Sequence, residues 1–193
     1  KLPEFSDIAS RQVLISYGHD NHLTAYFSAQ CDMRVIWGGD NTIRKIRQIP
    51  IPPTATELPF TDKFSLSLIA ASEFIELSRD EKSKLINFFI NDAFWFGQMA
   101  CSSPRLIVWL GEDDIVEKAK LLFWTQVNKV LTNNMADIST ADIVNKLVAS
   151  NRMAIEGQVS IIKSDNNLIT RIQLSSCDGI NTSLHCGGGL FYE

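Results

Sequence analysis

The residue of this sequence best placed to do chemistry is Cys101. It lies in the stretch GQMACSSPR, residues 97–105, between a predicted helix that ends at Gly97 and a predicted strand that begins after Pro104. A turn of this kind can present a thiol at a domain surface, near backbone N–H groups that stabilise a thiolate or an oxyanion. A thiolate attacks a carbonyl or thioester carbon and leaves again readily. The local context alone leaves open a second interpretation, in which Cys101 is a small buried hydrophobic residue.

A glycine turn is the second candidate site. Gly38 and Gly39 follow an apolar segment, residues 33–37, which is typical of a strand, and precede a predicted helix over 42–48. Glycine lets the backbone approach a phosphate, and the start of a helix favours its negative charge. The signal is weak, because Gly-Gly-Asp also marks ordinary turns and the sequence has no Gly-x-Gly-x-x-Gly fingerprint.

The remaining cysteines and histidines form no recognisable metal or redox motif. The four cysteines stand at positions 31, 101, 177 and 186 without a CxxC pair, so we expect free thiols and no zinc site. His19 and His22 lack a third residue with metal-ligand spacing. His185 precedes Cys186, and an interaction of His185 with Cys101 is an open alternative.

Composition places limits on the partners and the compartment. The chain has 193 residues, 45% hydrophobic and 21% charged, with a net charge of -4, which gives no general attraction to nucleic acid. It contains no apolar run of the roughly 18 residues that cross a membrane and no secretory signal, so we expect a cytoplasmic protein. Because the sequence begins without Met and stops soon after a triple-Gly loop, we also expect a fragment of a longer chain.

Strands and helices are predicted to alternate along the chain, which is typical of an α/β fold. Strands are expected at 13–17, 33–37, 64–71, 105–110, 158–163 and 168–174, and helices at 21–30, 42–48, 113–131 and 140–150. A capping box formed by Ser78 and Glu81 opens a further helix, with Leu85, Phe89, Ala93 and Phe96 on one face. The Pro-rich segment 49–53 is the best candidate domain boundary.

The Cys101 stretch resembles a known motif. Gly97-Gln98-x-x-Cys101, followed by Ser-Ser-Pro-Arg, is similar to the active-site cysteine motif of aldehyde dehydrogenases. It is closest to their acyl-CoA reductase branch, which includes the fatty acid reductase of bacterial bioluminescence operons. The stretches around residues 35–40, 50–66 and 185–189 resemble the same branch, so the resemblance runs with gaps over nearly the whole chain.

The resemblance implies an aldehyde dehydrogenase-like fold. Residues 1–60 would be the C-terminal part of the dinucleotide-binding domain, and residues 61–193 an incomplete catalytic domain. Cys101 would accept the acyl group of a long-chain acyl-CoA as a thioester, and NADPH would reduce that thioester to the aldehyde. The backbone N–H of Cys101 would bind the oxyanion, and Gly38 and Gly39 would pack against the dinucleotide. The asparagine that supplies the second oxyanion donor in the superfamily is not identifiable in this chain.

Glu57 is a weaker candidate. Aldehyde-oxidising relatives carry a water-activating glutamate in a Glu-Leu-Gly-Gly-Lys motif, whereas the segment here reads Glu57-Leu58-Pro59 and lacks both glycines. We expect a solvated loop carboxylate in preference to an acid/base group, because prolines flank the segment.

The partners implied by the resemblance are a fatty acyl-CoA or acyl-protein donor, acyl-transferase or synthetase subunits, and further copies of the full-length chain. Two alternatives stay open: a short-chain acylating aldehyde dehydrogenase, and an inert α/β interaction fragment. Reactivity of the Cys101 thiol in the folded protein would separate catalysis from the inert alternative.

Overall fold

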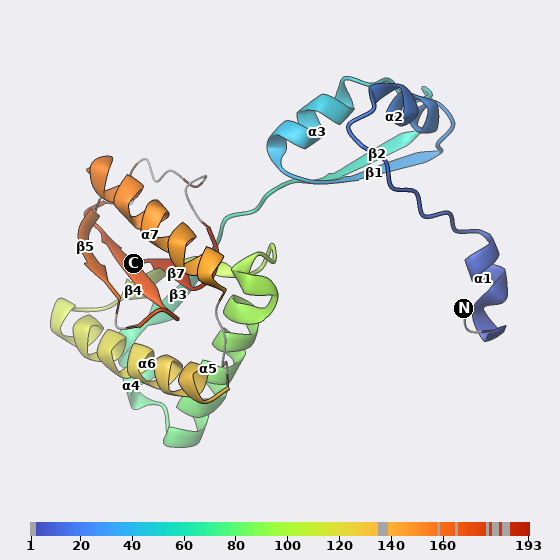
Figure 1. Cartoon of the computed structure of the whole chain (residues 1–193). Coiled ribbons are helices and arrows are strands. Elements are labelled where there is room, and N and C mark those ends of the chain that lie inside the picture. The colour runs from blue at the N-terminus through green and yellow to red at the C-terminus, as the bar shows by residue number, and fades with distance from the viewer. Residues whose placement is uncertain are drawn as a thin grey trace. The chain divides into compact units, whose positions relative to one another are not determined.

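The structure, a computed structural model, divides the chain into two compact units. They are Lys1–Asp62 and Lys63–Glu193, both of which can be followed in Figure 1. The described residues are 3–134, 139–157, 159–164, 166–176, 178, 182 and 186–193. Both units combine helices with strands, so the predicted α/β class is confirmed. Among the described residues, no helix is both long and apolar enough to cross a membrane.

The first unit is built on a pair of parallel strands. Its elements are the 3-10 helix η1 (Pro3–Phe5), α1 (Ser6–Ser10), α2 (Asn21–Ser28), β1 (Met33–Trp37), α3 (Asp40–Arg47) and β2 (Thr56–Phe60). β1 and β2 pair in parallel, with Val35 opposite Leu58. The strand, glycine turn and helix predicted for residues 33–48 are therefore confirmed.

The strand predicted at residues 13–17 is wrong. This segment has no regular structure, and the side chains of Val13 and Leu14 are 79% and 100% exposed. A strand needs a neighbour that accepts its backbone hydrogen bonds, and no described strand pairs with this segment. An apolar run therefore predicts a strand only where the fold also provides a partner.

The second unit contains a mixed sheet between two helical layers. Its elements are β3 (Ser65–Ala70), α4 (Ala71–Glu76), α5 (Arg79–Phe94), the 3-10 helix η2 (Trp95–Gln98), β4 (Pro104–Leu110), α6 (Asp113–Asn134), α7 (Thr140–Ile155), β5 (Val159–Lys163), β6 (Thr170–Leu174) and β7 (Leu190–Tyr192). Its described strands follow the order β3-β4-β7-β6-β5. β5 is antiparallel to β6, and the other neighbours are parallel.

Alternating residues of the sheet divide the core between its two faces. Ile107 of β4 and Phe191 of β7 pack with α4, α5 and α6, whereas Leu106, Leu190 and Tyr192 pack with α7. This alternation is what a pleated strand imposes when both of its faces are covered. Figure 1 shows α7 on one side of the sheet and the other helices of the unit on the opposite side.

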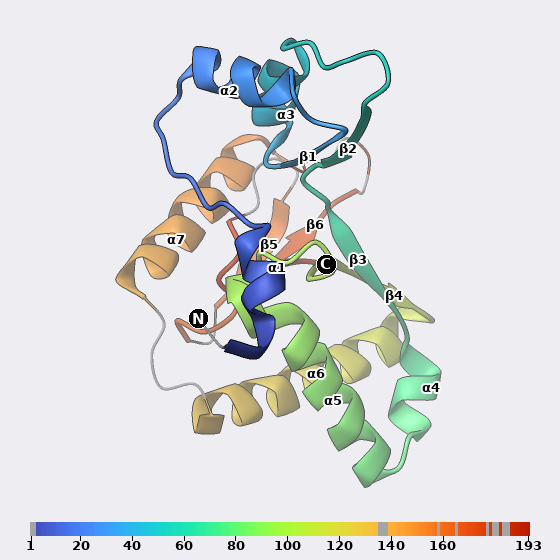
Figure 2. The ribbon, with the colours of Figure 1, turned by 90° about the vertical axis from the view of Figure 1, so that its right-hand side faces the viewer.

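The predicted helix that follows Ser78 is confirmed, and it ends before Phe96. Ser78 and Glu81 form the predicted capping box, and Phe89 and Ala93 are buried on the inner face. Phe96 lies beyond the end of α5 and is 77% exposed, so its predicted place on that face is wrong. Figure 2 views the second unit from the side on which α5 lies.

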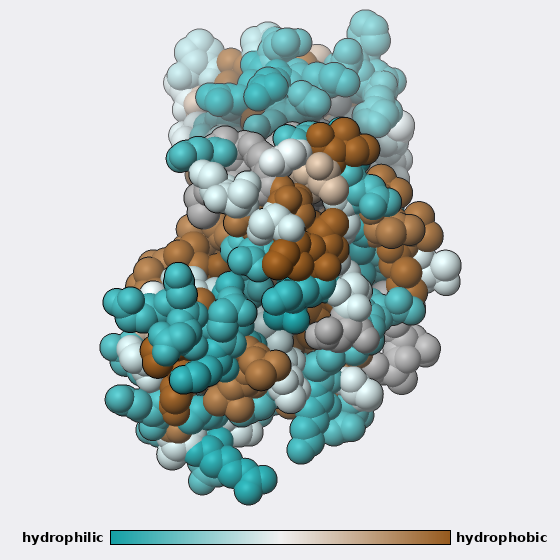
Figure 3. Space-filling model, turned by 90° about the vertical axis from the view of Figure 1, so that its left-hand side faces the viewer, coloured by the Kyte–Doolittle hydropathy of each residue, from teal (hydrophilic) through white to brown (hydrophobic). Residues whose placement is uncertain are grey.

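Hydrophobic residues are also exposed on the opposite side of the second unit. They lie on α7 and β5 and comprise Val144, Leu147, Val148, Ile155, Ile161 and Ile162. Figure 3, which views the side where α7 and β5 lie in Figure 1, shows hydrophobic surface interspersed with hydrophilic surface.

Candidate active site around Cys101

A left-handed turn leads from α5 to the Cys101 loop. Three consecutive residues after α5 have positive φ angles: Phe96 at 56°, Gly97 at 60° and Gln98 at 63°. The Met99 N–H donates to the Phe96 carbonyl at 3.0 Å and closes the turn. Positive φ is ordinary for glycine and unfavourable for a bulky L-residue, so other contacts must hold this conformation.

The buried side chain of Gln98 supplies those contacts. Its Nε2 donates to the carbonyls of Pro104 and Leu190 at 3.0 and 2.9 Å, and its Oε1 accepts from the Gly189 N–H at 2.9 Å. Gln98 is 0% exposed, so these hydrogen bonds are formed away from water. The glutamine of the cysteine motif therefore joins the turn to β4 and β7.

The Gly187-Gly188-Gly189 loop packs directly on this turn. The Gly188 N–H donates to the Gly97 carbonyl at 2.9 Å. A Cβ at Gly187 would lie 2.6 Å from the same carbonyl oxygen, and one at Gly189 would lie 2.1 Å from the Leu168 carbonyl oxygen. All three glycines have positive φ angles. Only glycine fits such close backbone approaches, so the triple-Gly loop belongs to the framework that holds the Cys101 loop.

Cys101 is exposed at the tip of this framework. Its thiol forms no disulfide with the described cysteines. Its carbonyl accepts a hydrogen bond of 2.6 Å from the Ser65 hydroxyl. Its N–H makes no hydrogen bond within the described part of the chain.

Buried polar residues fix the C-terminal side of the loop. Ser103, 1% exposed, donates its hydroxyl proton to the Asp92 carbonyl at 2.7 Å. The guanidinium of Arg105, 4% exposed, donates to the Lys63 carbonyl at 2.7 Å. The Ser-Ser-Pro-Arg part of the motif thus anchors the loop and leaves the thiol outside.

The site lies at the edge of the sheet where the parallel strands begin. Cys101 precedes β4, the glycine loop precedes β7, and Ser65 is the first residue of β3. Ligands of open α/β sheets generally bind at the opposite edge, beyond the carboxyl ends of the strands. The Cys101 loop therefore lies at the amino ends of the parallel strands, and the usual ligand crevice lies at their carboxyl ends.

A second thiol lies near the glycine loop and has a different environment. Burial raises the pKa of the Cys186 thiol, an effect that nearby Lys146 opposes. Burial lowers the pKa of the Lys146 ammonium, whose Nζ donates to the carbonyls of Asn167 and Leu168. Cys186 is thus held toward its protonated form and is a poor nucleophile. His185 and Cys177 lie outside the described residues.

The glycine turn of the first unit has a packing role of its own. Gly39 is the N-cap of α3, and a Cβ there would lie 3.0 Å from an Asp62 carboxylate oxygen. A Cβ at Gly38 would lie 3.1 Å from the Thr42 side chain. With Asp40 in the first turn of α3 and Asp62 beside Gly39, two carboxylates stand at this helix start. They disfavour a phosphate and suit a hydroxyl donor such as a ribose.

The expectation for Glu57 is wrong, because Glu57 lies in strand β2 and is largely buried. Arg34 donates to its Oε2, and the Arg47 Nε lies 2.8 Å from its Oε1. The Glu57 side chain is only 14% exposed. Sequence reasoning missed this ion pair because Arg34 lies on the neighbouring strand, opposite Glu57 in the parallel register.

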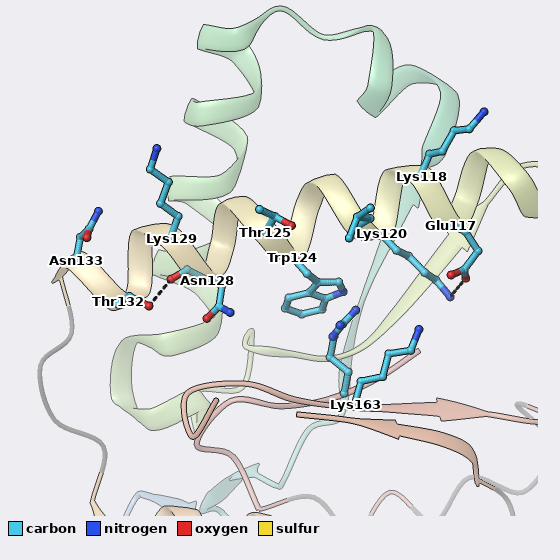
Figure 4. Close-up of a pocket in the computed structure, with 12 residues that line it drawn as sticks. Glu117, Lys118, Lys120, Trp124, Thr125, Asn128, Lys129, Thr132, Asn133 and Lys163 are labelled. Carbon is cyan, nitrogen blue, oxygen red and sulfur yellow. Dashed lines mark hydrogen bonds and ion pairs between the residues drawn. The ribbon is translucent and has the colours of Figure 1, made fainter. Parts of the chain in front are cut away.

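A further cavity of the second unit has no contact with Cys101. It has a volume of about 750 Å³ and lies between α6 and the turn end of the β5–β6 hairpin, where Lys163 pairs with Arg171, as Figure 4 shows. Lys118, Lys120 and Lys129 line it together with Trp124. Two of these lysines pair with carboxylates on α6. Among the described residues, no group of three or more His, Cys, Asp or Glu side chains could hold a metal ion.

Comparison with known proteins identifies the family. No curated protein sequence matches the chain. The sequence profile described as "Acyl-CoA reductase (LuxC)" matches residues 6–162, a range that includes β1, the Gly38-Gly39 turn and the whole Cys101 loop. Because this match covers most of the chain, the protein belongs to the LuxC family of acyl-CoA reductases.

Proposed function

We propose that this chain forms part of an NADPH-dependent reductase that converts long-chain fatty acyl-CoA to fatty aldehyde through a thioester on Cys101. The observation that carries the proposal is the exposed Cys101 thiol, on a loop fixed by buried hydrogen bonds, whose backbone N–H has no partner among the described residues. The fold is aldehyde dehydrogenase-like. The first unit is the end of the dinucleotide-binding domain, and the second belongs to the catalytic domain.

The first step is acyl transfer to sulfur. The Cys101 thiolate attacks the thioester carbon of acyl-CoA, and the Cys101 N–H stabilises the oxyanion that develops. Collapse of this intermediate breaks the bond to the CoA sulfur and leaves the acyl group on Cys101. The hydrogen bond from Ser65 to the Cys101 carbonyl orients the backbone at this point.

The second step releases the aldehyde. NADPH, when bound, supplies a hydride, two electrons and one proton, to the thioester carbonyl carbon. The bond to the Cys101 sulfur then breaks, and the thiolate is regenerated. Over the whole cycle, acyl-CoA, NADPH and one proton give aldehyde, NADP⁺ and CoA.

The first unit would contribute to cofactor binding. Gly38 and Gly39 would face an uncharged part of NADPH, because the nearby carboxylates of Asp40 and Asp62 suit its hydroxyl groups better than its phosphates. Both carboxylate oxygens of Glu57 form ion pairs, one with Arg34 and the other with Arg47. Glu57 is therefore not available to activate a water molecule.

The expected partners and compartment follow from this activity. We propose that the acyl group arrives on CoA or on an acylated protein, delivered by acyl-transferase or synthetase subunits. The full-length chain would assemble with copies of itself in the cytoplasm.

The test is reductase activity of the full-length protein with myristoyl-CoA. We expect NADPH oxidation matched one-to-one by aldehyde, and loss of both with Cys101→Ala. Cys186→Ala is the matched control and should retain activity, because burial holds its thiol protonated. Aldehyde production by Cys101→Ala would refute the proposal.

A further inference from the structure

Exposed apolar side chains precede Cys101 closely in the sequence. Trp95, Phe96 and Met99 are 62%, 77% and 57% exposed, although large apolar residues are usually buried. Beside them lies a cavity of about 320 Å³, lined by Asn91, Asp92, Trp95, Phe96, Ala100 and Ser102. Its wall therefore includes both chain neighbours of Cys101.

Phe96 departs from two rules of protein structure at once. It is a bulky L-residue with a φ of 56°, and its aromatic ring is mostly in contact with solvent. Neither property helps the unit to fold. The turn is nevertheless held in this conformation by the buried hydrogen bonds of Gln98. Such departures concentrate at functional sites, which indicates that the exposed ring has a role beyond folding.

We propose that Trp95 and Phe96, which line this cavity, form a platform that holds the acyl chain carried on Cys101 and selects long chains over short ones. This inference rests on the proposed function, since the thioester on Cys101 tethers the occupant next to the platform. The cavity lies within the range of about 300–1,000 Å³ that small-molecule pockets span. Its edge carries Asp92, whose negative charge disfavours the phosphates of CoA and leaves the apolar chain as the suitable occupant.

The apolar surface extends along α5. Phe88 lies on α5, nearly two helical turns before the end of this helix at Phe94, and is 57% exposed. Two turns of helix span about 10 Å. A long acyl chain that starts at Cys101 can therefore cover the platform and continue toward Phe88, whereas an acetyl group reaches neither.

The experiment measures the rate at which Cys101 of the full-length protein is acylated by acetyl-CoA and by myristoyl-CoA, using intact-mass spectrometry. The test variant is Phe96→Asn, because asparagine tolerates positive φ and keeps the turn while it removes the ring. We expect the preference for myristoyl-CoA over acetyl-CoA to fall about 15-fold, as two methylene groups lose apolar contact at about fourfold each. Trp95→Gln, which leaves the left-handed turn untouched, should lower it similarly.

Ile155→Asn is the matched control, since it removes an apolar side chain that is 85% exposed at the end of α7. It should leave the chain-length preference unchanged. An unchanged preference in Phe96→Asn and Trp95→Gln, with normal circular dichroism, would overturn the platform alone. If the chain-length preference is unchanged but the two variants no longer self-associate, the platform is overturned, and these side chains contact a second copy of the chain instead. If neither acetyl-CoA nor myristoyl-CoA acylates wild-type Cys101, the proposed function is overturned as well.

Discussion

Replacement of Gln98 by alanine should destabilise the second unit strongly, although Gln98 takes no part in the chemistry. The change removes three hydrogen bonds and leaves two carbonyls and one N–H buried without their partner. Each such group costs about 1–3 kcal/mol. Because the loop can relax toward solvent, we expect a total loss of about 4 kcal/mol, a large part of the 5–15 kcal/mol that stabilises a typical domain.

A second replacement separates the hydrogen bonds from the backbone strain. Gln98→Gly loses the same hydrogen bonds, but glycine accepts the φ of 63° without the cost of about 1–2 kcal/mol that an L-residue pays. Its greater freedom in the unfolded chain offsets part of this gain. Gln98→Gly should therefore be about 1 kcal/mol more stable than Gln98→Ala.

Urea unfolding followed by circular dichroism measures both effects. With an m-value of about 2 kcal/mol/M, Gln98→Ala should lower the midpoint by about 2 M. Leu121→Ala on α6, where the side chain is 72% exposed, is the control and should change stability by less than about 0.5 kcal/mol. A loss below about 1 kcal/mol for Gln98→Ala would refute the claim that Gln98 holds the Cys101 loop.

Three further changes test other parts of the structure. Burial raises the pKa of Tyr192 to about 12, and its hydroxyl makes no hydrogen bond within the described residues. The folded state thus keeps a proton that the unfolded chain releases, and stability should fall between pH 10 and pH 12. Tyr192→Phe should raise stability by about 1 kcal/mol and flatten this alkaline loss in urea titrations at pH 9 and pH 11.5. Gly189→Ala should lower the free energy of unfolding, followed by thermal denaturation, by more than about 4 kcal/mol, because its Cβ would lie 2.1 Å from a carbonyl oxygen. Gly157→Ala has a similar φ in open space and should cost only about 1–2 kcal/mol. Glu57→Gln should destabilise the first unit by about 2–3 kcal/mol, measured by limited proteolysis, since it leaves two arginines without their carboxylate.

The sequence predicted elements whose signals are local. The capping box at Ser78 and the helix of α5 could be identified because the two residues that form the cap lie three positions apart. Strand β1 and the glycine turn after it were likewise predicted from contiguous residues. Strand β7 was missed because it has three residues and follows a glycine loop, although it lies between β4 and β6 and all three of its residues are buried.

The framework of the candidate site depends on contacts that no local pattern contains. Both Gln98 and the triple glycine were visible in the sequence, but the hydrogen bond between Gln98 and Gly189 joins residues 91 positions apart. The Ser65 hydroxyl reaches the Cys101 carbonyl because β3 and β4 are parallel neighbours that begin at the same edge of the sheet. The motif around Cys101 indicated where the chemistry would be, and the tertiary structure adds what holds it there.

The most direct test of the central claim is to isolate the acylated protein. The full-length chain is mixed with myristoyl-CoA without cofactor, and its mass is measured. One portion is then digested, and its modified peptide is sequenced by tandem mass spectrometry. NADPH is added to the other portion. The account predicts one acyl group on Cys101 that hydroxylamine removes and that NADPH discharges as aldehyde. An acyl group on another residue, or an adduct on Cys101 that NADPH leaves intact, would contradict it.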